Sequence, residues 1–90
     1  MNIIVKRRVT DYEAWKSLVS TANEIRREKG SRGATVYRNA KNPNEVYLVF
    51  DWDDRKPYQD YFALPDVQRT LAETGSFEIV EISDSFHLAE

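Results

Sequence analysis

Residues 2–9 form a short, β-branched segment with Ile3, Val5 and Val9 on one face and Ile4 on the other, which predicts a β-strand at the start of the chain. From Thr10 onward the apolar spacing changes to three and four, the period of an amphipathic helix. The apolar stripe of that helix consists of Tyr12, Trp15, Leu18, Val19, Ala22 and Ile25. We expect about five turns that are capped by Thr10 and end at Gly30. Arg26 and Arg27 complement the helix dipole near its C-terminal end.

Two further strands are predicted at residues 33–39 and 45–53. The segment between them, 41–44, contains two asparagines and a proline, which favour a tight turn and therefore a hairpin. Apolar residues occupy every position from 46 to 50. Such a continuous run predicts that both faces of the second strand are covered by other parts of the structure.

A helix in two pieces is predicted after residue 53. Asp53 or Asp54 can cap the first piece, and Pro65 begins the second. The inward stripe of the first piece consists of Tyr58, Tyr61 and Phe62. Residues 77–88 predict a last strand, which carries apolar side chains on both of its faces.

The order of these elements predicts an α+β fold. Four antiparallel strands with both helical crossovers on one face form a ferredoxin-like split βαβ sheet, and we expect residues 1–90 to be a single such domain. The helices can cover only one face, whereas the third and fourth strands are apolar on both. The uncovered face therefore needs a partner, and we predict an identical subunit, that is, a homodimer.

Charge is unevenly distributed along the chain, although the net charge is only -2. Residues 1–41 carry ten basic and four acidic groups, whereas residues 42–90 carry three basic and eleven acidic ones. A basic half could bind an anionic ligand or nucleic acid. The interpretation we prefer is that the halves interleave in space and neutralise each other. The RNA-recognition motif has the same element order, but residues 45–50 begin with an acid and lack its glycine, so we expect no nucleic-acid partner.

Several classes of site are excluded by what the sequence lacks. The chain has no cysteine, one histidine (His87) and three isolated glycines, so disulfides, the usual zinc sites and a phosphate-binding loop are absent. We therefore expect neither a metal nor a cofactor. No apolar run approaches the roughly 20 residues of a membrane span, and because the first residues show no apolar segment with a small-residue cleavage site, we expect no signal peptide. A cytoplasmic protein with no membrane partner is expected.

Two short segments resemble a known family. One is the helix start Asp11-Tyr12-x-x-Trp15, and the other is the sequence DWDD at 51–54, which closes a strand before an aromatic helix. With the element order, these features resemble the dimeric α/β-barrel superfamily, and within it the antibiotic biosynthesis monooxygenase-like group, over nearly the whole chain. The resemblance implies that two sheets pack face to face as a dimeric barrel. It also implies a pocket between the sheet and the helices of each subunit.

The resemblance further implies a small-molecule ligand. Members include cofactor-independent monooxygenases of polycyclic phenols, haem-degrading enzymes and small-molecule isomerases. Trp52 matches the tryptophan that closes the third strand in catalytic members, whereas their histidine falls on Tyr61 or Phe62. The asparagine of haem-degrading members falls near Lys6, where this chain has none.

The candidate ligand-binding residues are aromatic or basic side chains near the expected pocket. They are Trp52, Tyr61, Tyr58, Arg38 and Trp15. An apolar pocket, a hydrogen-bonding group for a phenol and a cation for its anion would suffice for cofactor-free oxidation of an aromatic or polyketide-like substrate. No catalytic residue is assigned. The alternative is a dimerising or ligand-sensing module without turnover.

Overall fold

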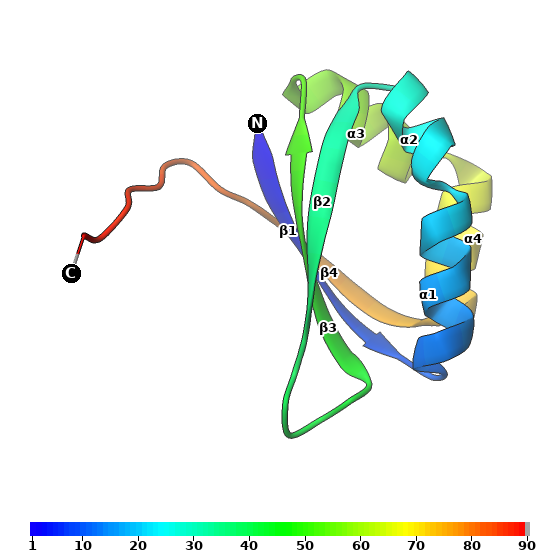
Figure 1. Ribbon diagram of the computed structural model, residues 1–90. Helices are drawn as coiled ribbons and strands as arrows, with labels where there is room; N and C mark the ends of the chain where they lie inside the picture. The colour runs from blue at the N-terminus through cyan, green and yellow to red at the C-terminus, as the bar shows by residue number, and fades with distance from the viewer. Residues whose placement is uncertain (90) are drawn as a thin grey trace.

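The two central strands of the sheet are β1 and β3, and the full strand order is β2-β3-β1-β4, antiparallel throughout. The computed structural model describes residues 1–89. Along the chain the elements are β1 (Asn2–Val9), α1 (Tyr12–Thr21), α2 (Asn23–Glu28), β2 (Ser31–Arg38), β3 (Glu45–Trp52), α3 (Arg55–Ala63), α4 (Pro65–Glu73) and β4 (Gly75–Glu81). All four helices lie on one side of the sheet (Figure 1). The predicted ferredoxin-like α+β fold is confirmed.

The core lies between the sheet and the helices. In the register of the central pair, Ile3 lies opposite Phe50 and Val5 opposite Leu48, so that alternate residues of both strands face the helices. The buried apolar side chains are Ile3, Val5, Val9, Trp15, Val46, Leu48, Phe50, Trp52, Tyr58, Tyr61 and Phe62. Every other residue of β1 and β3 therefore points to the opposite, helix-free face.

The helix-free face of the sheet combines apolar and charged side chains. Ile4 lies between Val49 on β3 and Val80 on β4, and all three are only partly buried. One step along β1, Lys6 lies opposite Glu78 of β4. The basic first part of the chain thus sits beside the acidic second part, which agrees with neutralisation across neighbouring strands.

The first helix differs from its prediction at both its start and its middle. Its N-cap is Asp11, whose carboxylate accepts a hydrogen bond from the Ala14 amide at 3.1 Å, so the expected Thr10 cap is wrong. The Thr10 backbone N–H instead donates a hydrogen bond to the Thr74 carbonyl. The expected five-turn helix is also interrupted at Ala22, where the backbone ψ is 0°.

The last strand is shorter than predicted. It begins at Gly75 and ends at Glu81. Beyond Glu81, β1 provides only one more hydrogen bond, which the Asn2 carbonyl accepts from the Ile82 amide. Residues 82–89 leave the sheet on the side away from the helices (Figure 1) and expose Phe86 (83 %) and Leu88 (70 %). None of the helices formed by residues 1–89 has both the length and the apolar character of a membrane span.

Candidate ligand-binding site

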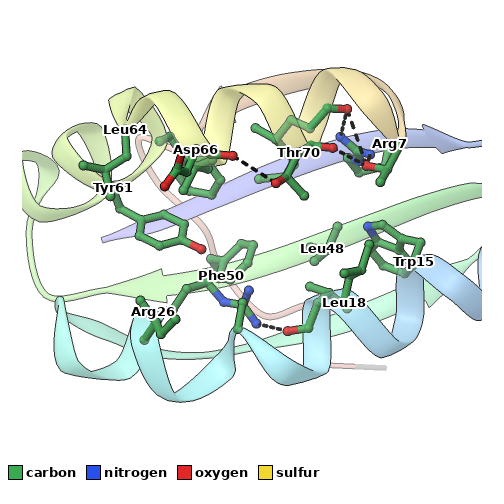
Figure 2. Close-up of a pocket in the computed structure, with 18 residues that line it drawn as sticks. Arg7, Trp15, Leu18, Arg26, Leu48, Phe50, Tyr61, Leu64, Asp66 and Thr70 are labelled. Carbon is green, nitrogen blue, oxygen red and sulfur yellow. Dashed lines mark hydrogen bonds between the residues drawn. The ribbon is translucent and has the colours of Figure 1, made fainter.

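A cavity of about 340 Å³ lies between the helices and the sheet (Figure 2). Its walls come from β1, β3 and all four helices. The apolar part of the lining consists of Val5, Trp15, Leu18, Val19, Ala22, Ile25, Leu48, Phe50, Phe62, Leu64, Val67 and Leu71. Small-molecule sites typically have volumes of about 300–1,000 Å³ and a mostly apolar lining with a few polar groups. By size and lining, this cavity can hold a small apolar molecule.

Arg7 is one of the polar groups that line the cavity. It occupies a helix-facing position of β1 and is only 2 % exposed. Its guanidinium donates to the Leu71 carbonyl at 3.0 Å and to the Thr74 hydroxyl, both at the C-terminal end of α4. Burial lowers the pKa of the Arg7 guanidinium, although an arginine stays charged at neutral pH. Its Nε is buried without a hydrogen-bond partner.

Arg26 is the second buried cation in the lining. It lies on α2, is 8 % exposed, and donates from Nη2 to the Val19 carbonyl at 2.6 Å. Because Val19 belongs to the last turn of α1, this bond satisfies one of the carbonyls left free where the helix is interrupted. The guanidinium also lies 5.7 Å from the centre of the Phe50 ring. Its Nε, like that of Arg7, is buried and has no partner.

The two guanidinium groups share one electrostatic property. Within residues 1–89, neither forms an ion pair with a carboxylate. Their hydrogen-bond acceptors are uncharged groups: carbonyls at a helix C-terminus, which carry about half a negative charge in total, and for Arg7 also the Thr74 hydroxyl. Asp66, the one acidic residue of the lining, is exposed and paired with Arg69. The cavity is therefore apolar and positively charged.

Tyr61 supplies a hydroxyl group to the same cavity. Its ring packs against Trp52 with centroids 5.5 Å apart, and Figure 2 shows the side chain directed into the cavity from α3. Trp15, from α1, contributes to the wall at the other end. These two candidates from the sequence are brought together in one site.

The other three candidates lie outside the cavity. Trp52 is fully buried beneath Tyr61, and its indole N–H has no partner within residues 1–89. The Tyr58 hydroxyl donates to Glu81 of β4 and lines a shallower hollow on another side of α3. Arg38 lies on the edge strand β2, 3.7 Å from the centre of the Tyr12 ring.

Sequence reasoning missed Arg7 and Arg26 as parts of the site, although each left a signal. Arg7 falls on the same face of β1 as Val5 and Val9, so it is a charge on an otherwise apolar face. Arg26 lies four residues after Ala22, on the apolar stripe of the predicted helix. A long charged side chain at such positions is either folded back to solvent or held inside by specific partners.

The chain matches the family model described as antibiotic biosynthesis monooxygenase over residues 10–73. It belongs to this family. No curated protein matches the chain. Among solved structures, the cofactor-independent oxygenase SnoaB from Streptomyces nogalater is similar with a TM-score of 0.81 and 15% identity, covering 99% of this chain and 96% of that one. Rv0793 from Mycobacterium tuberculosis is similar with a TM-score of 0.65 and 15% identity, covering 93% and 96%. At identities this low, the similarity to these two solved structures establishes the fold alone.

Proposed function

We propose that this chain binds a small, mostly apolar aromatic molecule in the cavity and oxidises it without a cofactor, acting as a monooxygenase on a phenolic or polyketide-like substrate. The observation that carries the proposal is the cavity itself, which combines aromatic walls, the Tyr61 hydroxyl and two buried cations. Membership of the antibiotic biosynthesis monooxygenase family and the fold shared with SnoaB support it.

The chemistry requires little of the protein because the substrate supplies all the electrons. An electron-rich phenolate reacts with O2; one oxygen atom becomes a new ring carbonyl. The other leaves as water with two hydrogens, one from the ring carbon and one from the phenol. The Tyr61 hydroxyl can donate a hydrogen bond to the phenolate oxygen. The cations stabilise the anion, and the apolar walls exclude bulk water.

An oxygen electrode tests this proposal directly. With 1,8-dihydroxyanthrone as probe and a protein-free blank to subtract its autoxidation, we expect uptake of one O2 for each anthraquinone formed. Tyr61→Phe should reduce the rate by roughly 10²-fold or more, because it removes the hydrogen bond to the phenolate oxygen. Tyr12→Phe is the matched control, because Tyr12 lies on α1 and does not line the cavity. Uptake no faster than the blank, with this and other hydroxylated polycyclic aromatics, would refute the oxygenase.

We also propose that two copies pair through their helix-free sheet faces. Partly buried apolar residues at the centre of that face, Ile4, Val49 and Val80, support this pairing. So does the tail, which leaves the sheet on the same side (Figure 1) and carries the exposed residues Phe86 and Leu88. Light scattering should give twice the chain mass of 10.5 kDa. A monomer at micromolar concentration would contradict the pairing.

A second candidate is a ligand-binding protein without turnover. One observation favours it: within residues 1–89, the only carboxylate at the cavity is that of Asp66, which is exposed and paired with Arg69, and no imidazole lines it. The cavity thus lacks a strong general base for the phenol proton. Tight binding of the anthrone without O2 uptake above the blank would select this function over the oxygenase.

A further inference from the structure

The buried charge of the cavity is larger than one phenolate needs. Two guanidinium groups, each at least nine-tenths buried, line a space that contains no buried carboxylate within residues 1–89. Burying a charge is costly unless it is paired and hydrogen-bonded, and each Nε here is buried without a partner. The helix carbonyls that they contact compensate only part of each charge. Negative charge from a bound ligand would complete the neutralisation of these two groups.

The two arginines are not equally available. Both Nη atoms of Arg7 donate to the end of α4, and its Nε is enclosed by the surrounding protein. In Arg26 only Nη2 has an acceptor, the Val19 carbonyl. Its Nε is likewise enclosed, so Nη1 is the nitrogen that remains for a ligand. Figure 2 shows the labelled Arg7 and Arg26 at different ends of the cavity, one on the β1 side and one on α2. Because its Nη1 has no acceptor within residues 1–89, Arg26 is the better holder of an acidic group.

The remaining lining defines the rest of the ligand. Phe50 lies beneath Arg26, and the walls between Arg26 and Trp15 are aliphatic or aromatic. A flat apolar ring fits that lining, and its acidic substituent would meet the Arg26 guanidinium. A carboxylate is the group whose planar oxygens a guanidinium pairs with best.

We propose that the natural ligand of this cavity is an aromatic carboxylic acid, ionised at neutral pH, whose carboxylate is bound by Arg26. The inference deepens the proposed function, because it specifies the substrate class of the same cavity. It concerns binding alone, so it can stand or fall independently of whether O2 is consumed.

The test compares two probes of almost identical shape. Isothermal titration calorimetry is performed with 2-naphthoate and with 2-naphthamide, which differ in charge but not in ring or size. We expect the acid to bind at least tenfold more tightly than the amide, and we expect Arg26→Gln to bring the two affinities close together. Arg27→Gln is the matched control, because Arg27 lies on the same helix but is exposed; it should preserve the preference.

Three results would overturn the proposal: equal affinity of the native protein for the acid and the amide, no binding of either, or an undiminished preference in Arg26→Gln. If Arg26→Gln does not fold, Arg26→Lys keeps the charge and loses the planar donor set. It should then reduce the affinity for 2-naphthoate at least tenfold, while the affinity for the amide stays the same. Failure of the oxygenase proposal would appear differently, as naphthoate binding by a protein that consumes no O2 with any phenol.

Discussion

Gly75 allows β4 to start against β1, and replacing it tests how closely the two strands approach. Its φ is +144°, and a Cβ added there would lie 1.9 Å from the Arg8 carbonyl oxygen. Gly33 is the matched control, since its φ is +125° but an added Cβ would meet no heavy atom within 4 Å. Both alanine variants carry the cost of an unfavourable φ, about 1–3 kcal/mol. Only Gly75→Ala must also displace the β1 backbone, which adds about 1–3 kcal/mol.

The difference between the two variants isolates the close approach. For a chain of 90 residues, an extra loss of about 2 kcal/mol lowers Tm by a further ~8–16 °C. Thermal unfolding followed by circular dichroism gives the Tm of both variants. All samples are measured at one protein concentration, because a dimer would make Tm concentration-dependent. If Gly75→Ala and Gly33→Ala lower Tm by the same amount, the close approach to the Arg8 backbone does not restrict the residue at position 75. That result would refute the reasoning.

Two further predictions concern the tail and the sheet face. A chain that ends at residue 85, without Phe86 and Leu88, should shift from dimer to monomer in light scattering. Alanine at both positions in the full chain should have the same effect. An intact dimer in both variants would show that the tail takes no part in pairing. The hydrogen bond that Tyr47 donates to Glu45 at 2.8 Å raises the pKa of Tyr47 above its ordinary 10.0. Because the folded-state pKa is the higher one, this contribution to stability is complete below pH 10 and is lost as pH rises through the folded pKa. An ultraviolet titration of the phenol should show Glu45→Gln lowering this pKa, and an unchanged titration would rule out the hydrogen bond as its cause.

The fold could be predicted from the sequence because its elements are specified by short-range periodicity. The β-branched residues of 2–9 and the apolar run at 46–50 both predicted strands that the structure contains. The end of β4 could not be predicted in this way, since it depends on where β1 stops pairing. Residues 82–88 have a strand pattern but no neighbouring strand within the described chain.

The site was only partly predictable, for a related reason. Trp15 and Tyr61 lie on helix stripes that must face the sheet, so pattern alone places them near the cavity. Trp52 also faces the helices, but Tyr61 packs over it, and only three-dimensional packing decides which of the two reaches the cavity. The partners of Arg7 are 64 and 67 residues away in sequence, so no local pattern reveals why that charge is buried.

The interruption at Ala22 has a consequence for the buried charge of the cavity. In a continuous helix the Val19 carbonyl would accept the backbone N–H four residues on, whereas the break at Ala22 leaves it for the Arg26 guanidinium. Leu18 and Ile25, which lie on either side of the break, are both about half exposed and line the cavity. The break therefore gives a buried cation its acceptor in a wall that is otherwise apolar. An unbroken helix would line the cavity with the same apolar side chains but would leave the Arg26 charge without that acceptor.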